Sequence, residues 1–305
     1  MYYPSGVFRK KALAALKGHW QTALLIALVV NLPTLLMQGF SIFTGNDVLD
    51  RFEAIIVSAS RDGILSEQLL LDEARVLLSS TSFWVIRGLE AVAWLITPCL
   101  SLGMYVWLLN RLRGVPEEPV NTVFCRTKYF FKAIGLQLMI ILKVLLWMLP
   151  GLAVLAFVMR PLYSVTTQEQ LNAAVRSFYG MLFPVILLIA VPAAIAALRY
   201  ALAEYMMADR PESKIMQCIR RSKELMQERK KQLFFLLASF ILWYLLMLLV
   251  SSMLAGILSL VFQMLAGLAL SVYMYCSVSA FYLYVEEADR RHEDPEKEPE
   301  PEELN

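Results

Sequence analysis

Residues 233–285 read LFFLLASFILWYLLMLLVSSMLAGILSLVFQMLAGLALSVYMYCSVSAFYLYV and contain no charged side chain. One helix of this length would be about 80 Å long, more than twice the roughly 30 Å hydrocarbon thickness of a bilayer. The stretch must therefore turn back on itself, and Gly256 and Gly267 bracket the expected turn. This predicts two membrane spans, at about residues 233–253 and 265–285.

Four other apolar runs are long enough to cross a bilayer. They lie at about residues 20–40, 83–109, 133–158 and 178–200. Hydrophobic residues make up 58% of the 305-residue chain and charged residues 18%, against about 45–50% and 25% in soluble domains. We therefore expect an all-α, polytopic membrane protein with six transmembrane helices in residues 1–285, which excludes an ordinary soluble enzyme.

Lys and Arg are unevenly distributed between the spans. Of 28 such residues, 21 lie in the two terminal segments and in the second and fourth connections, and five in the other three connections. Because basic connections are retained in the cytoplasm, we expect a multi-pass protein of the cell membrane with both termini cytoplasmic.

Two segments lie outside the six spans. Residues 41–82 carry a net charge of −4, and their apolar residues recur at helical spacing. This pattern predicts two amphipathic helices that lie on the membrane or cover the bundle, with a lid over a binding site as the alternative. Residues 286–305 hold ten acidic residues and three prolines, which predicts a disordered, acidic cytoplasmic tail.

Three charged residues lie inside predicted spans. Lys143 would be about 15 Å deep, near the midplane, where a charged side chain is costly. Glu90 would be about 10 Å below the opposite surface, so we expect Lys143 to pair with it. Arg87, one turn from Glu90, is the competing partner. The pair would either fix helix packing or form a substrate or proton site.

A basic amphipathic stretch precedes each odd-numbered span, which predicts three helix-plus-hairpin units and a weak internal repeat. The most basic stretch is residues 213–231. We expect it to lie against anionic lipid head groups, although the charges could instead serve only to fix the topology. Its basic residues are Arg220, Arg221, Lys223, Arg229, Lys230 and Lys231.

Sequence motifs of enzymes give no support for catalysis. There is no GxGxxG, Walker, HExxH or GxSxG pattern. Glu286 and Glu287, followed by Arg291, match the EExxxR string of intramembrane proteases, but that string follows the last span and lacks the histidine pattern of those enzymes. Two distant histidines and four scattered cysteines predict no metal site, disulfide framework or cofactor, and the net charge of +2 gives no nucleic-acid signal.

Several residues near both ends of the chain resemble a family of bacterial integral membrane proteins known as domain of unknown function 975. They are Lys17, Gly18, His19, Trp20, Tyr205, Asp209, Pro211, Ser222, Met226, Lys230, Phe234, Ser239, Phe240, Trp243, Ala280, Phe281 and Tyr282. The resemblance implies a multi-span membrane protein and brings no catalytic residues. Glu228 stands where the family has a glycine, so we expect the basic helix to continue directly into the fifth span.

Three function classes remain open. We expect a non-catalytic membrane component that interacts with lipids or with protein partners. A transporter or permease-like protein with a polar intramembrane site is the alternative, and an intramembrane enzyme is the third class. Convergence of polar residues at one depth would favour a transporter, and only Arg87, Glu90 and Lys143 meet that condition.

The charge distribution makes the topology testable. Cysteines introduced into residues 45–75 and 162–172 should react with a membrane-impermeant thiol reagent applied to intact cells. A cysteine in the tail beyond Arg291 should react only after permeabilisation. Labelling of that tail in intact cells would show that the orientation is wrong.

Overall fold

Every secondary-structure element in the described part of the chain is helical. The computed structural model describes residues 5–44, 75, 81–115, 120–163 and 168–293. The helices are α1 (Ser5–Leu16), α2 (Trp20–Thr44), α5 (Thr81–Leu112), η1 (Val120–Phe124), η2 (Thr127–Tyr129), α6 (Phe130–Tyr163), α7 (Gln168–Tyr200), α8 (Ala203–Asp209), α9 (Ile215–Leu225), α10 (Lys230–Met253) and α11 (Gly256–Glu293). Six of them, α2, α5, α6, α7, α10 and α11, are long and apolar enough to cross a membrane. The predicted fold class is confirmed.

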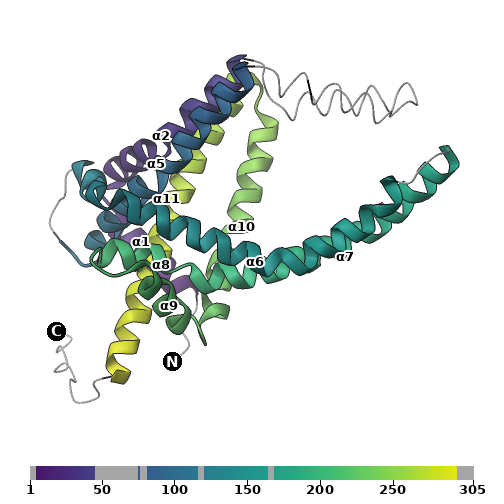
Figure 1. Ribbon diagram of the computed structural model, residues 1–305. Helices are drawn as coiled ribbons and strands as arrows, with labels where there is room; N and C mark the ends of the chain where they lie inside the picture. Colours follow the sequence, from purple (N-terminus) through teal and green to yellow (C-terminus); the bar gives the residue numbers. More distant parts are fainter. Residues whose placement is uncertain (1–4, 45–74, 76–80, 116–119, 164–167, 294–305) are drawn as a thin grey trace.

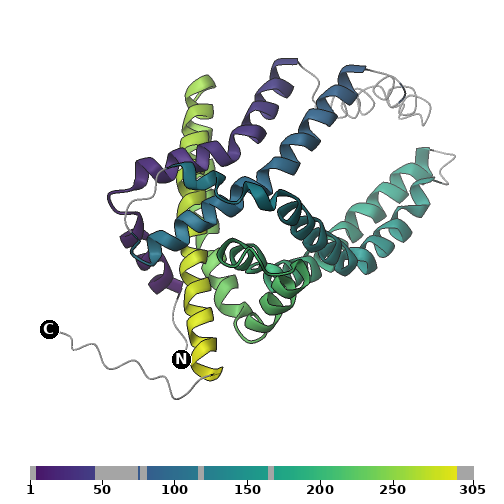
Figure 2. The same cartoon turned by 60° about the vertical axis from the view of Figure 1, so that its left-hand side comes forward.

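The six long helices form three hairpins, α2 with α5, α6 with α7, and α10 with α11. Short helical segments precede each hairpin, namely α1, η1 with η2, and α9. Figures 1 and 2 show that the hairpins diverge, with the α6–α7 hairpin extending away from the α2–α5 hairpin. The three helix-plus-hairpin units predicted from the sequence are therefore present as an arrangement of helices.

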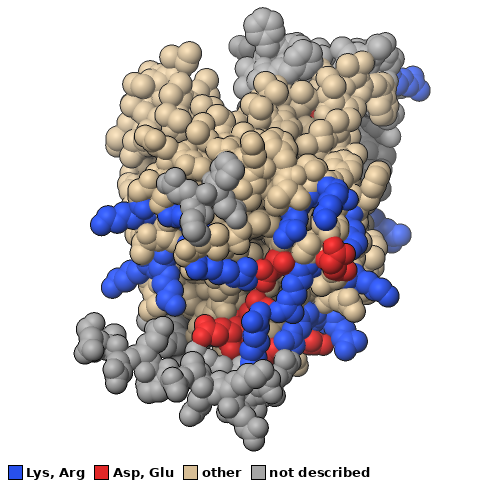
Figure 3. All heavy atoms as spheres, turned by 90° about the vertical axis from the view of Figure 1, so that its left-hand side faces the viewer, with Lys and Arg blue, Asp and Glu red and all other residues tan. Residues whose placement is uncertain are grey.

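The hairpins meet at one end of the molecule, where α1, α8 and α9 lie (Figure 1). Lys and Arg side chains gather in the lower part of the face shown in Figure 3, whereas its upper part is largely uncharged. We call the end that contains α1, η1, η2, α8 and α9 the charged end. The buried core includes one face of α1, the last third of α5, nearly all of α8, and the part of α11 near residues 276–285. The core thus lies toward the charged end.

Helix α5 is the centre of the bundle. In its most apolar window 61% of the residues are buried, whereas the corresponding values for the other five long helices are 22% or less. Apolar side chains exposed on those helices are what a lipid-facing surface requires. At Gly103 of α5 the backbone of η1 comes so close that a Cβ atom would lie 1.9 Å from the Val123 carbonyl oxygen.

The turn in residues 233–285 lies earlier than predicted. Helix α10 ends at Met253 and α11 begins at Gly256, so the sixth helix begins about nine residues before the expected 265. Gly256 has φ +56°, a backbone conformation that glycine adopts without steric cost, whereas Gly267 lies inside α11. The Ser259 hydroxyl donates to the Ser251 carbonyl at 2.9 Å and closes the hairpin.

Two boundaries at the charged end also require correction. Helix α11 continues to Glu293, so the predicted disorder from residue 286 is wrong for residues 286–293. The expected continuous helix over residues 213–231 is also wrong, because a turn separates α9 from α10. In that turn Met226 is fully buried, and Arg229 donates to the Val285 carbonyl at 3.0 Å.

Some predictions lie beyond the described residues. Most of the segment 41–82 belongs to this group, as do residues 294–305. The amphipathic helices of the first segment and the acidic tail at the C-terminus therefore stay predictions.

Candidate functional site

Helix α8 is buried at the charged end and brings polar groups into the core. Four of its residues after Glu204 are buried, as is Ala203 before it. The Tyr105 hydroxyl on α5 donates to the Glu204 carboxylate at 3.1 Å, and the Tyr105 and Tyr205 ring centroids are 4.4 Å apart. Glu204 is half-buried, and a carboxylate withdrawn from water needs hydrogen-bond donors, so the Tyr105 hydroxyl satisfies part of this requirement.

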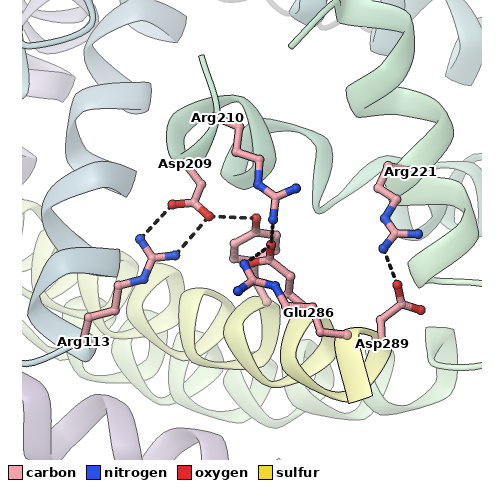
Figure 4. Close-up of polar contacts among 8 residues, drawn as sticks. Arg113, Asp209, Arg210, Arg221, Glu286 and Asp289 are labelled. Atoms are coloured by element: carbon pink, nitrogen blue, oxygen red, sulfur yellow. Dashed lines mark hydrogen bonds and ion pairs between the residues drawn. The ribbon is translucent and has the colours of Figure 1, made fainter. Parts of the chain in front are cut away.

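Asp209, the last residue of α8, joins three helices. Its carboxylate accepts two hydrogen bonds from the Arg113 guanidinium just beyond α5, at 2.7 and 2.9 Å, and one from the Tyr282 hydroxyl on α11 at 3.3 Å. Figure 4 shows the Arg113 guanidinium facing the Asp209 carboxylate. The hydrogen bonds to Asp209 raise the pKa of Arg113. A bidentate pair of this kind fixes both distance and orientation.

Two carboxylates on α11 continue the ionic network (Figure 4). Glu286, whose side chain is 6% exposed, pairs with Arg210 and with Arg290, the latter at 2.8 Å. Asp289 pairs with Arg221 of α9. These pairs explain why the acidic stretch after the predicted sixth span is helical rather than disordered.

The second unit contributes basic groups to the same end. Arg126 donates to the Ala208 carbonyl at the end of α8 at 2.8 Å, and Lys132 donates to the Pro211 carbonyl at 3.0 Å. Cations near a helix C-terminus complement the partial negative charge of its free carbonyls. The Tyr129 hydroxyl donates to Glu212, and this bond, with Lys132 nearby, lowers the pKa of that carboxyl.

The six basic residues predicted to face lipid divide into three groups. Arg221 and Arg229 bind Asp289 and the Val285 carbonyl of α11, respectively. Arg220 pairs with Glu224 on its own helix at 3.2 Å and is 82% exposed. The structure shows no hydrogen bond or ion pair within the described residues for the remaining three, Lys223, Lys230 and Lys231, of which Lys223 and Lys231 are exposed and Lys230 is half-buried.

A polar cavity of about 510 Å³ lies beside α8 and α9. Arg210, Arg220 and Arg221 line it together with Ser213, Gln217 and Glu224. Guanidinium groups, a hydroxyl and an amide are donors that suit phosphate oxygens. Metal binding has no comparable support here, because no cluster of three His, Cys, Asp or Glu side chains occurs among the residues that the structure describes.

The expected pair of Lys143 with Glu90 is replaced by the competing one. Arg87 Nη1 lies 2.9 Å from Glu90 Oε2, and in the described part of the chain Lys143 has no hydrogen bond or ion pair. Arg87 and Glu90 are neighbours on one helix face, whereas Lys143 belongs to the diverging α6–α7 hairpin (Figure 1). Arg87 reaches Glu90 along its own helix, whereas Lys143 would have to reach across from another helix.

Together, six apolar helices and a charged end held by partly buried ion pairs define a multi-pass helical membrane protein. The chain belongs to the family described as "Protein of unknown function (DUF975)", whose model matches residues 1–289. This match confirms the resemblance seen in the sequence. No curated protein and no solved structure matches the chain significantly.

The central carboxylates of this site could not be assigned from the sequence. Arg113 and Asp209 are 96 positions apart, and no local spacing connects them. Asp209 was singled out only by the family resemblance, and Glu286 only by a protease-like string. In the structure Glu286 forms ion pairs with Arg210 and Arg290, which gives this carboxylate a structural role.

The Asp209 contacts can be tested by substitution. Asp209→Asn removes a carboxylate that is 12% exposed and leaves Arg113 unpaired, so we expect a loss of about 1–3 kcal/mol, because this pair is less buried than those whose disruption costs about 3–5 kcal/mol. Adding Arg113→Gln should restore part of that loss. The measurement is thermal unfolding of the purified protein in mild detergent.

A matched control is Arg220→Gln, which breaks an exposed pair on one helix. It should change stability by no more than about 0.5 kcal/mol. Equal losses for Asp209→Asn and Arg220→Gln would mean that the Asp209 pair does not stabilise the charged end.

Proposed function

We propose that this protein is a non-catalytic component of the cell membrane whose charged end binds the phosphate groups of anionic lipids in the cytoplasmic leaflet. The observation that carries the proposal is the set of basic side chains left free of intramolecular partners. Lys223 and Lys231 are exposed and have no hydrogen bond or ion pair within the described residues. Each basic residue near an anionic surface contributes about 1 kcal/mol to binding.

The cavity beside α9 supports the same proposal. Its three arginines each bind an acidic side chain, yet a guanidinium has five N–H donors, so each keeps donors for a phosphate group. The mostly uncharged surface above the basic side chains (Figure 3) would face lipid tails, and the basic side chains would then lie at the level of the head groups. In this orientation both termini are cytoplasmic.

A transporter is the second candidate, and the ion pair of Arg87 with Glu90 favours it. This pair lies in α5 within the part of the chain that could span the membrane. Intramembrane charges commonly mark substrate or ion pathways. Transport of a solute across vesicles that contain the protein would distinguish this function from lipid binding alone.

The lipid proposal is testable on the full-length protein. Native mass spectrometry in mild detergent would compare binding of phosphatidylglycerol with that of phosphatidylcholine carrying the same acyl chains. For Lys223→Gln/Lys231→Gln we expect phosphatidylglycerol affinity to fall by about 2 kcal/mol, or about 30-fold. Rising salt should weaken binding of the unmodified protein.

The matched control is Arg160→Gln/Arg176→Gln, which removes two exposed charges from the α6–α7 hairpin, on the side expected to be extracellular. This variant should bind phosphatidylglycerol as the unmodified protein does. Equal loss in both double variants, or equal binding of the two lipids by the unmodified protein, would contradict the proposal.

A further inference from the structure

A groove of about 580 Å³ lies between α2 and α5, away from the charged end. Its lining includes Thr34 of α2 and Arg87, Glu90, Ala91, Trp94 and Thr97 of α5. The volume is within the range of about 300–1,000 Å³ found for small-molecule sites. Its walls combine one cation, one anion and one indole with apolar and hydroxyl side chains.

The ion pair on the groove wall is only partly satisfied by its own contacts. Arg87 Nη1 lies 2.9 Å from Glu90 Oε2, and the two side chains are 39% and 34% exposed. Arg87 Nε is buried and has no hydrogen-bond partner in the described part of the chain. The guanidinium carbon lies 5.7 Å from the centre of the Phe83 ring. Arg87 Nη2 and Glu90 Oε1 have no hydrogen bond or ion pair within the described residues, so both remain for further contacts.

The depth of this pair makes those contacts necessary. The span-forming part of α5 begins at Phe83, which places Arg87 about 6 Å and Glu90 about 10 Å along the helix. Partly exposed charges at such a depth need water or a polar ligand, because hydrocarbon cannot solvate them. A ligand with one charge would satisfy one member of the pair and repel the other, whereas a zwitterion can satisfy both.

We propose that the α2–α5 groove binds a zwitterion of head-group size, with its phosphate or carboxylate at Arg87 and its ammonium at Glu90. The exposed Trp94 indole supplies a second site of attraction for the ammonium, since cations bind to the faces of aromatic rings. This chemistry is shared by the head group of a zwitterionic phospholipid and by a small free zwitterion. The groove is separate from the charged end, so a test of this proposal is independent of the test of anionic-lipid binding.

Native mass spectrometry of the full-length protein in mild detergent tests this site. The probes are phosphatidylethanolamine and diacylglycerol with identical acyl chains, and soluble phosphoethanolamine. A lipid source predicts that phosphatidylethanolamine binds at least tenfold more tightly than diacylglycerol. A free source predicts that phosphoethanolamine binds by itself while the two lipids bind equally. Absence of both preferences would overturn the proposal.

Substitution of the pair assigns the binding to the groove. Arg87→Gln/Glu90→Gln should lower binding of the preferred zwitterionic probe at least tenfold and leave phosphatidylglycerol binding at the charged end unchanged. Unchanged binding of the zwitterionic probe would overturn the proposal.

A second pair of variants keeps both charges, so the site can still be tested if Arg87→Gln/Glu90→Gln does not fold. Ala91→Leu adds bulk on the groove wall at an exposed position of α5. Val92→Leu adds bulk at a neighbouring exposed position that does not line the groove. We expect at least a tenfold loss of zwitterion binding for Ala91→Leu and none for Val92→Leu. Equal binding by these two variants would exclude the groove as the site.

Discussion

The bidentate hydrogen bond between Arg113 and Asp209 is the contact on which the arrangement of the three hairpins depends. Asp209 also accepts from Tyr282, so one carboxylate at the end of α8 joins the end of α5 to α11. Arg126, from the segment before α6, binds the adjacent Ala208 carbonyl. Elements of all three units therefore contact the last two residues of α8, Ala208 and Asp209. Lipid tails are as apolar as the outer helix faces, so those faces gain little from packing on each other. The buried apolar core and the polar contacts, both at the charged end, hold the hairpins together.

Several arginines at the charged end make contacts within the folded protein. A high count of Lys and Arg predicts which connections stay in the cytoplasm, but it does not predict where each side chain points. Arg221 and Arg229 contact α11, whereas Lys223 and Lys231 are exposed. The difference is chemical as well as positional, because arginine binds carboxylates and carbonyls through a planar fork, and lysine binds through a single flexible ammonium. The lysines are therefore the better candidates for contact with a lipid surface.

The features predictable from the sequence are those set by local physics. Apolar runs of about 20 residues or more identify the six long helices, because the bilayer thickness sets the length of a span. The sequence pattern brackets the turn between Gly256 and Gly267 because either glycine can supply the break, and only the structure shows that Gly256 is the one with a positive φ. The Asp209 contacts were beyond reach because they join distant parts of the chain. The depths of the spans and the reach of a Lys side chain favour Lys143 as the partner of Glu90, with Arg87 as the competitor. Because the hairpins diverge, the pair that forms is the one with Arg87 on the same helix.

The most direct test of this arrangement is to measure the distance between two hairpins at their ends opposite the charged end. Spin labels at Val85 of α5 and Tyr179 of α7, both exposed, would be placed in a protein in which the exposed Cys125 is replaced by serine. Pulsed electron paramagnetic resonance on the protein in lipid nanodiscs would then measure their distance, with a label pair on the contacting helices α1 and α11 as the short-distance reference. If the hairpins are joined only at the charged end, they diverge toward the opposite end. The Val85–Tyr179 distance should then be much longer than the reference distance. A distance as short as the reference, typical of helices packed with axes about 10 Å apart, would contradict it.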